Sequence, residues 1–214
     1  MLSVSTSRAH SKLRRCRGRR RPATARPEFG CARRIKVNPD AAQRQARAGA
    51  LRMGIAVYVP TRLRGGFRCL DPRRIPEGRF DEAAVLSKPE CSSTPVALSK
   101  LPRLDLFVAG AVAVTPDRRC CGKGHGYNDI ECAILLGLGH PPVPVFTTVH
   151  ELQMVSNVPV ARHHLPVSVI VTADRFLRVL PPPPAPVGID WGELPAEVLA
   201  AMPVLRDLQE LCDG

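Results

Sequence analysis

The sequence is poor in aromatic residues: its 214 residues include one Trp, two Tyr and six Phe, which together make up 4% of the chain. Any core must therefore rest on Val, Leu, Ile and Ala. Hydrophobic residues reach 44% in total, which is enough for a sizeable core and excludes a wholly disordered or collagen-like chain. The length corresponds to one domain, or to one domain with tails.

Long apolar runs are missing as well. No segment approaches the roughly 18 consecutive apolar residues of a membrane-spanning helix, and no apolar segment of a secretory signal is present. None of the eight cysteines forms a C-x-x-C pair. The sequence therefore predicts a soluble cytoplasmic protein without a membrane partner, in which the cysteines are reduced thiols.

Acidic residues are scarce at the beginning of the chain. Residues 1–34 hold eleven Lys and Arg but a single acid, Glu28, whereas the remaining 180 residues hold 20 basic and 18 acidic residues. Of the net charge of +12, the first segment therefore carries 11 − 1 = +10 and the remaining residues 20 − 18 = +2. A nearly neutral body lacks the charge excess that a domain needs to neutralise the phosphates of a duplex. Nucleic acid is thus expected as a partner only through residues 1–34.

Segment 1–34 is rich in Ser and Arg and shows no apolar periodicity. Three interpretations are open for it. The first is a disordered arm that binds acidic partners. The second is an organellar transit peptide, which would place the protein in an organelle. The third is the product of a wrongly assigned start codon. We expect a disordered basic tail over these residues, and order from about Ile35.

The first ordered half combines a helix and a short strand. Asp40 is a fair N-cap for a helix over residues 41–53, and Gly54 is a typical glycine at its end. A β-favouring run over 55–59 follows, and Pro60 stops it. We expect a loop over 61–79 and a short helix over 80–86.

The second half carries three apolar, β-branched runs of the kind that form strands buried on both faces of a sheet. They span residues 104–114, 143–149 and 167–172. A loop over 115–126 leads into a helix over 127–138, in which Ile130, Ile134 and Leu138 recur every four residues. Strands that alternate with helices and crossovers predict an α/β fold over 35–180, a three-layer, doubly wound structure with a mostly parallel sheet.

The end of the chain differs in composition. Residues 181–186 are a proline-rich, stiff spacer. Residues 187–214 form a helical extension, with helical turns over 196–211 that are interrupted at Pro203. An apolar stripe on this extension is expected to pack on the domain; its members are Val198, Met202, Leu205 and Leu208.

One segment carries a chemical pattern, the run CGKGHGYNDIE over residues 121–131. Its glycines, Gly122, Gly124 and Gly126, stand at alternate positions, which lets the backbone turn its N–H groups toward an anion. The helix N-terminus that follows adds partial positive charge, and Lys123 adds a full one. Asp129 lies in the first helical turn, where it can hold a Mg²⁺ ion that bridges phosphate oxygens. The spacing fits neither a Walker A loop nor the Rossmann fingerprint, so a plain turn is the alternative.

The loop resembles the glycine-rich nucleotide loop of the 5-formyltetrahydrofolate cyclo-ligases, or methenyltetrahydrofolate synthetases. It is most similar to the branch of methenyltetrahydrofolate synthase domain-containing proteins, where the loop runs G-K-G-E-G-Y-x-D-x-E. The resemblance covers about residues 35–205. Its other matches are the runs KVNPD over 36–40, VPTRLRGGF over 59–67, residues 105–129, TVH over 148–150 with Gln153, and GIDW over 188–191.

The resemblance implies a doubly wound fold shared with ribose-phosphate isomerases and CoA transferases. It also implies a reaction that depends on ATP and Mg²⁺ and closes 5-formyltetrahydrofolate, a reduced folate, to 5,10-methenyltetrahydrofolate. In that reaction the formyl oxygen takes the γ-phosphoryl group and folate N10 then displaces phosphate. Lys123 and Tyr127 would be catalytic, Asp129 and His164 would correspond to the metal ligands, and the cofactor would be bound by Gly122, Lys123, Gly124, His125, Gly126, Tyr127 and Asn128.

Three departures from the family pattern predict weak or absent turnover. The N-terminal part of the family domain, which contributes to the ATP and pterin sites, is expected to be missing, so the fold would be N-terminally incomplete. His125 and Asn128 replace the usual residues of the loop. His164 stands where the family has an Asp, and imidazole is a poor ligand for Mg²⁺. The alternatives are a non-catalytic member that binds a nucleotide or pterin, and a binder of nucleic acid or acidic partners through residues 1–34.

The role of Glu131 is left open at this stage. It lies one turn into the helix, where its carboxylate could pair with Lys123 or reach a water molecule bound to the metal. A solvent-exposed glutamate on the outer face of the helix is the equally weighted alternative.

Overall fold

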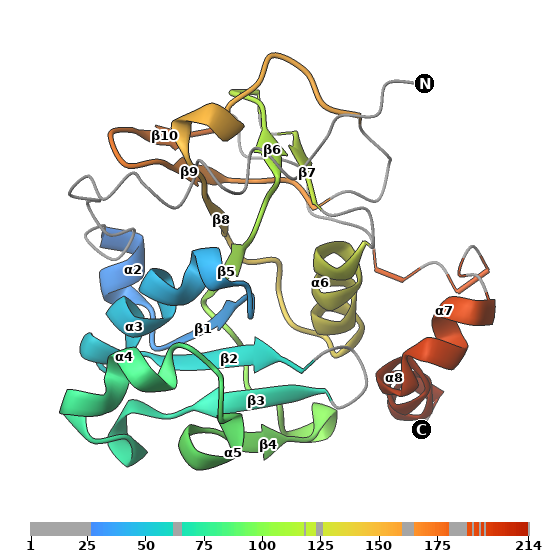
Figure 1. Cartoon of the computed structure of the whole chain (residues 1–214). Coiled ribbons are helices and arrows are strands. Elements are labelled where there is room, and N and C mark those ends of the chain that lie inside the picture. Colours follow the sequence, from blue (N-terminus) through green and yellow to red (C-terminus); the bar gives the residue numbers. More distant parts are fainter. Residues whose placement is uncertain are drawn as a thin grey trace.

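The computed structural model of the chain describes most of the residues beyond the basic segment (Figure 1). The described residues are 27–61, 66–117, 119–122, 126–159, 165–179, 188–189, 191–192, 194 and 196–213. Within them, a central sheet has the strand order β10-β9-β8-β5-β1-β2-β3-β4. These strands are β1 (Arg34–Val37), β2 (Ala56–Pro60), β3 (Phe67–Leu70), β4 (Thr94–Val96), β5 (Leu106–Ala109), β8 (Val145–Thr148), β9 (Val169–Val171) and β10 (Phe176–Arg178).

The middle of this sheet is parallel and its edges are antiparallel. β1 pairs in parallel with β2 and with β5, and β8 pairs in parallel with β5 and with β9. The antiparallel pairs β2–β3, β3–β4 and β9–β10 lie toward the edges. The prediction of a mostly parallel α/β sheet is therefore confirmed.

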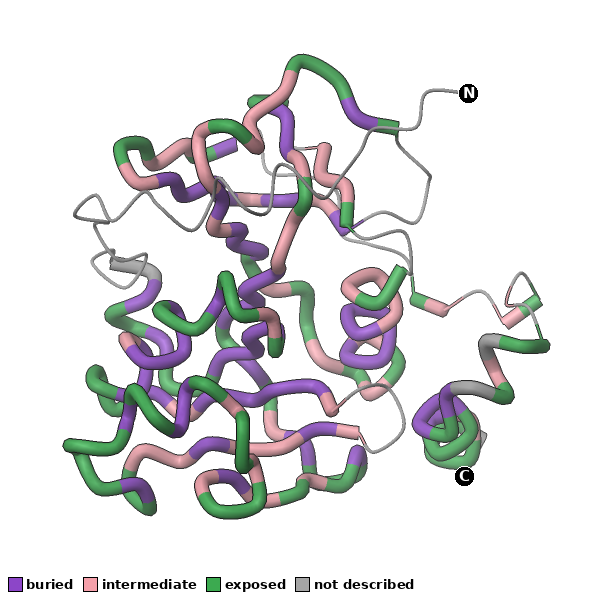
Figure 2. The backbone as a smooth tube through the Cα atoms, in the orientation of Figure 1, coloured by how far each residue is buried: buried purple, intermediate pink, exposed green. Residues whose placement is uncertain are grey.

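Helices cover both faces of the sheet. On β5, Leu106 and Val108 belong to a core that includes residues of α3 (Arg44–Arg52), whereas Phe107 and Ala109 belong to a core that includes residues of α6 (Tyr127–Gly137). Because successive strand residues point to opposite faces, α3 and α6 lie on opposite sides of the sheet. The central strands run buried between exposed outer segments (Figures 1 and 2). This is the three-layer, doubly wound arrangement that the sequence predicts.

Local sequence signals account for the two main helices. α3 follows a short 3-10 turn, η2 (Ala41–Gln43), and is rich in alanine. It ends before Gly54, which adopts a φ of +76° that suits glycine. Ile134 of α6 is buried, and Ile130 and Leu138 pack at the border of the same core. Both helices confirm the sequence prediction to within a few residues at their ends.

Two segments that the sequence assigns to loops contain strands. β3 lies inside the predicted loop 61–79, and β7 (Cys120–Cys121), which pairs with β6 (Ala113–Val114), lies inside the predicted loop 115–126. Both predictions are wrong because these strands are short and lack an apolar pattern of their own; Arg68 and Cys69 are only half-buried. β3 pairs with β2 and β7 pairs with β6, the strands that directly precede them, and the residue pattern of β3 and β7 does not reveal this pairing.

The remaining elements are short helices around the sheet. They are α2 (Pro27–Cys31), η3 (Pro72–Arg74), η4 (Glu77–Arg79), α4 (Phe80–Ala83), α5 (Pro89–Ser92), η5 (Leu98–Lys100), η6 (Glu151–Gln153), α7 (Ala196–Ala201) and α8 (Pro203–Asp213). α4 is shorter than the helix predicted over 80–86.

The border of the predicted tail differs from the structure. α2 lies within residues 1–34, and the ring of Phe29 is fully buried against Phe146, with 6.2 Å between the ring centroids. The folded part therefore includes residues that the charge pattern assigns to a disordered segment. A single buried aromatic residue among many arginines gives too weak a local signal. Residues 1–26 lie outside the described part of the chain.

The C-terminal helices pack on the α6 side of the sheet. Met202, Leu205 and Leu208 are buried in the same core as Ile134, as the predicted apolar stripe requires. The side chain of Val198, the fourth member of that stripe, lies outside the described residues. Among the helices that the structure describes, none is both long and apolar enough to cross a membrane.

Candidate functional site

The sheet has a topological switch point between β1 and β5. These two parallel strands are neighbours, but the chain leaves β1 through α3 toward β2, and leaves β5 through α6 toward β8 on the other side. In open α/β sheets, ligands bind outside the carboxyl ends of the strands at such a switch point. Asn38 follows the last residue of β1, and Gly110 follows the last residue of β5.

The N-terminus of α6 lies at this switch point. Asn128, in its first turn, donates a hydrogen bond from Nδ2 to the carbonyl oxygen of Gly110 at 3.0 Å. Its Oδ1 accepts a hydrogen bond from Nδ2 of Asn38 at 2.7 Å. The side chain of Asn128 thus connects α6 to the ends of both strands. Both halves of its amide bind protein groups, although the family resemblance places it among the cofactor-binding residues.

Gly126 is the N-cap residue of α6 and has a φ of +63°, in the left-handed region. This conformation turns the loop that follows Gly122 into the helix. A Cβ added at Gly126 would lie 3.9 Å from Oδ2 of Asp129, an ordinary van der Waals distance. The Cβ would therefore fit, but the left-handed backbone would be strained in any residue that has one. The glycine is needed here for its backbone conformation.

We expect Gly126→Ala to destabilise the protein by about 1–2 kcal/mol, the cost of a left-handed conformation in a residue with a Cβ. Urea unfolding measures this change. Gly122→Ala is the matched control, because nothing lies within 4 Å of its added Cβ and its φ is not positive. Equal loss of stability in both variants would contradict the assignment of strain to Gly126.

Asp129 faces the segment that returns toward β9. Its Oδ1 accepts a hydrogen bond of 2.6 Å from the backbone N–H of Leu165, the residue that follows His164 in the chain. The carbonyl oxygen of Leu165 accepts a hydrogen bond from Sγ of Cys120, in β7. Burial raises the pKa of that Cys120 thiol to about 12, so it stays protonated at neutral pH. The backbone of Leu165 therefore binds both α6 and β7, whose residues lie 36 and 45 positions away in the sequence.

The structure describes part of the predicted site. Gly122 and Gly126 are exposed, Tyr127 is 45% exposed, and Asn128 and Asp129 are half-buried. The exposure of Tyr127 agrees with a contact in a site and not with a place in the core. Lys123, Gly124, His125 and His164 lie outside the described residues.

Glu131 has a role that none of the sequence hypotheses contains. It is 5% exposed and forms an ion pair with Lys36 of β1, which is fully buried. Its carboxylate therefore does not lie on a solvated face, and that alternative is wrong. Lys123, the partner considered in the other hypothesis, lies outside the described residues. The pair with Lys36 was not foreseen because the two residues come from separate elements, which only the packing of α6 on β1 brings together. Burial lowers the pKa of Lys36 and raises the pKa of Glu131, and the charge of each partner opposes this shift.

Further polar residues that the sequence reasoning missed line the same edge of the sheet. Oγ1 of Thr148, at the end of β8, donates a hydrogen bond of 2.7 Å to Oε1 of Gln43, which is fully buried. Nε2 of Gln153, in η6, donates a hydrogen bond of 2.8 Å to the carbonyl oxygen of Ala111 after β5. The available signal was a polar residue at the carboxyl end of a strand, as at Thr148 in β8 and at Asn38 directly after β1.

The residues present fit a phosphate group better than a metal held by protein alone. An eleven-residue helix begins at the switch point, and a helix N-terminus favours anions. Among the described residues, no group of three or more His, Cys, Asp or Glu side chains could hold a metal ion. Mg²⁺ is commonly bound by one or two carboxylates together with substrate phosphates, and Asp129 offers one such carboxylate.

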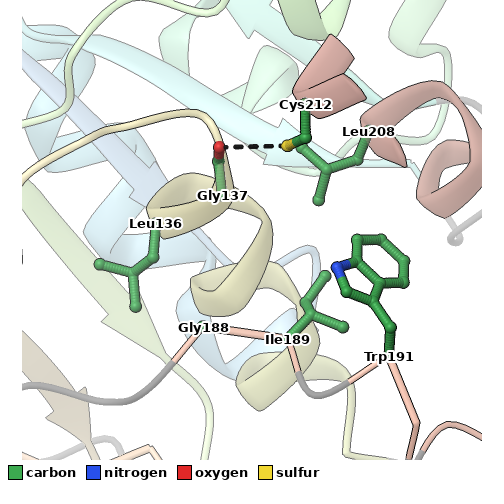
Figure 3. Close-up of a pocket in the computed structure, with 7 residues that line it drawn as sticks. All are labelled: Leu136, Gly137, Gly188, Ile189, Trp191, Leu208 and Cys212. Atoms are coloured by element: carbon green, nitrogen blue, oxygen red, sulfur yellow. Dashed lines mark hydrogen bonds between the residues drawn. The ribbon is translucent and has the colours of Figure 1, made fainter. Parts of the chain in front are cut away.

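A surface pocket lies at the other end of α6 (Figure 3). Its volume is about 310 Å³, and it is lined by Leu136, Gly137, Gly188, Ile189, Trp191, Leu208 and Cys212. Cys212 donates a hydrogen bond of 3.5 Å to the carbonyl oxygen of Gly137 across it. Because α6 is about 15 Å long, this pocket is remote from the switch point. It does not belong to the candidate site.

Comparisons with known proteins show the family of the chain. The model of the 5-formyltetrahydrofolate cyclo-ligase family matches residues 5–173. The chain belongs to the 5-formyltetrahydrofolate cyclo-ligase family. The match includes both strands of the switch point and α6, and it extends into the basic segment 1–34 that the charge pattern sets apart.

The curated relatives include methenyltetrahydrofolate synthase domain-containing proteins. The chain is 38% identical to the methenyltetrahydrofolate synthase domain-containing protein of Mus musculus over 190 residues, 85% of this chain and 51% of the relative. It is 36% identical to the protein of the same name from Bos taurus, over 94% of this chain and 55% of the relative. A solved structure of Aquifex aeolicus 5,10-methenyltetrahydrofolate synthetase aligns with a TM-score of 0.49 and 15% identity, covering 80% of this chain and 83% of that one. The chain thus spans about half the length of the curated relatives it matches.

Proposed function

We propose that this member of the cyclo-ligase family binds ATP with Mg²⁺ at the N-terminus of α6. In this proposal it converts 5-formyltetrahydrofolate to 5,10-methenyltetrahydrofolate, at a low rate. The observation that carries the proposal is the placement of that N-terminus, with Gly126 as its N-cap, at the switch point between β1 and β5. Backbone N–H groups and the helix dipole there favour the charge of a phosphate chain.

The residues would divide the work as follows. Gly122, Lys123, Gly124, His125 and Gly126 would surround the phosphates, with Lys123 as the full positive charge. Tyr127, which is exposed beside the loop, would contact the formyl end of the folate. Asp129 would be the carboxylate ligand of Mg²⁺, and His164 would be the residue at the second ligand position. When bound, ATP with Mg²⁺ supplies the phosphoryl group that activates the formyl oxygen.

The protein's own contribution is positioning and neutralisation of charge. A phosphoryl transfer needs its reacting groups in line and its charges compensated, with little covalent chemistry from the protein. The contacts of Asn128 and Asp129 hold the first turn of α6 against β1, β5 and the segment that ends at Leu165. A low rate follows from His164, because imidazole nitrogen suits Mg²⁺ less well than a carboxylate oxygen.

The direct experiment is a turnover assay. The protein is incubated with ATP, Mg²⁺ and 5-formyltetrahydrofolate, and methenyltetrahydrofolate is followed by its near-ultraviolet absorbance. We expect slow formation of the product, and a faster, more Mg²⁺-dependent reaction in His164→Asp. ATP binding without any turnover in either protein would favour the non-catalytic, ligand-binding alternative. Fast turnover by the unmodified chain would contradict the inference that His164 slows the reaction.

Nucleotide binding by itself tests the loop. We expect Lys123→Ala to weaken ATP binding by about 1–3 kcal/mol, the scale of one charge-assisted contact. Isothermal titration calorimetry measures this loss. Lys100→Ala is the matched control, because it removes an exposed lysine of η5 and the same unit of charge. Equal ATP affinities for the wild type and Lys123→Ala would contradict the phosphate-binding role of the loop.

A further inference from the structure

A chain of buried polar contacts runs beneath the N-terminus of α6. Nζ of Lys36 donates a hydrogen bond to Oδ1 of Asn38. Nδ2 of Asn38 donates to Oδ1 of Asn128, and Nδ2 of Asn128 donates to the carbonyl oxygen of Gly110. Lys36 is fully buried and Asn38 is 7% exposed, so little solvent competes for their contact, whereas Asn128 and Gly110 are half-buried.

The direction of this chain is determined by its two ends. A lysine ammonium has only donors and a backbone carbonyl has only acceptors, whereas each amide between them can turn either way. With Lys36 at one end and Gly110 at the other, both asparagine amides have a single orientation that satisfies every contact. Turning either amide would place two donors or two acceptors against each other, which is costly in a buried site.

Lys36 is itself held in place by groups on the α6 side of the sheet. It forms the ion pair with Glu131, one turn after Asn128 on α6, and its Nζ lies 3.8 Å from the ring centroid of Phe107. The first two turns of α6 are therefore joined to β1 at two points, Asn128 and Glu131. Apolar packing alone is not directional and would not set the rotation of the helix in this way.

We infer that Lys36 and Asn38 are positioning residues, which hold the N-terminus of α6, through Glu131 and Asn128, in the orientation that binds phosphate at the switch point. This inference rests on the proposed function for its link to ATP, but its structural part stands on the contacts themselves. Neither residue touches the ligand. Their effect on ligand binding passes through the helix.

The test uses the double variant Lys36→Met/Glu131→Leu, which removes both charges and keeps the volume. Such apolar replacements of buried ion pairs are often neutral or stabilising, so a folded protein is expected. Hydrogen exchange then reports on α6 locally. We expect the amides of residues 130–133, which donate to carbonyls of the first turn, to exchange about tenfold faster. Those of residues 135–138 should keep their wild-type rates. The ATP dissociation constant should rise by roughly tenfold, the lower end of the effect of removing an outer-shell partner.

Two further variants complete the test. Arg68→Met removes hydrogen bonds from β3, toward the edge of the sheet, to Ser93 and to the carbonyl oxygen of Pro89, and should change neither readout. Asn38→Ala breaks the chain of contacts without removing the ion pair. It should also speed up exchange at residues 130–133, which keeps the test decisive if the double variant does not fold.

The outcomes separate the two claims. Unchanged exchange at residues 130–133 in a folded variant, or unchanged ATP affinity despite faster exchange, overturns the positioning role. A wild-type protein that does not bind ATP overturns the proposed function instead, and the exchange rates still decide whether Lys36 and Asn38 position the helix.

Discussion

Glu131→Leu is expected to lower the free energy of unfolding by about 3–5 kcal/mol, because it leaves the buried ammonium of Lys36 without its partner. Lys36 is fully buried, so water cannot replace the lost carboxylate. Lys36→Met should cost a similar amount, since it leaves the carboxylate of Glu131 buried. The double variant should recover most of the lost stability. The destabilisation of each single variant comes from the unpaired buried charge, and the double variant has no such charge. Urea unfolding of the four proteins measures these differences.

The pH dependence of Glu131→Leu gives an independent check. Burial already lowers the pKa of Lys36 from 10.5, and removing the carboxylate that opposes this effect lowers it further. Between the lowered pKa and 10.5, the unfolded state binds more protons than the folded state, so stability rises with pH. The variant should therefore regain stability relative to the wild type as the pH increases toward 10. Additive losses in the double variant, or a stability difference that does not change with pH, would contradict the buried pair.

The second large effect is expected at Asp129. If its carboxylate binds Mg²⁺, Asp129→Asn should abolish the increase in ATP affinity that Mg²⁺ produces, an effect of about 10–100-fold. The amide of Asn keeps an oxygen that can accept the hydrogen bond from Leu165, so the fold should be almost unaffected. Asp129→Ala should lose the same Mg²⁺ effect and also about 1–3 kcal/mol of stability, because the Leu165 N–H then lacks its acceptor.

Calorimetric titration of ATP with and without Mg²⁺, together with urea unfolding, separates these roles. A preserved Mg²⁺ effect in Asp129→Asn would mean that Asp129 only holds the segment at Leu165. A loss of stability in Asp129→Ala without loss of the Mg²⁺ effect would lead to the same conclusion.

The candidate site could be predicted from local sequence for a physical reason. Alternate glycines, a lysine and a helix start lie within a few consecutive residues, so the loop before α6 and its first turn, Gly126 to Asp129, can be identified without knowledge of the fold. The partner that holds Asn128 in place, Asn38, could not be found in this way. Asn38 and Asn128 are 90 residues apart, and nothing in the pattern around either one specifies the other.

The sequence by itself determined the elements whose signals are local. The alanine-rich helix α3 ends at a glycine with positive φ, α6 begins at Gly126, and the apolar runs of β5, β8 and β9 require burial on both faces. Caps, periodicity and apolar runs act over a few residues, which is why they can be recognised one segment at a time.

Only the tertiary structure decided which elements meet. β1 has a charged residue in its interior and no long apolar run, yet it lies in the middle of the sheet, because β2 and β5 pair with it on both sides. That pairing buries Lys36, and the packing of α6 on the same face supplies Glu131 as its partner. A buried charge is tolerated only where a partner from elsewhere in the chain compensates it. The fold therefore determines the role of Lys36, and the local sequence around it does not.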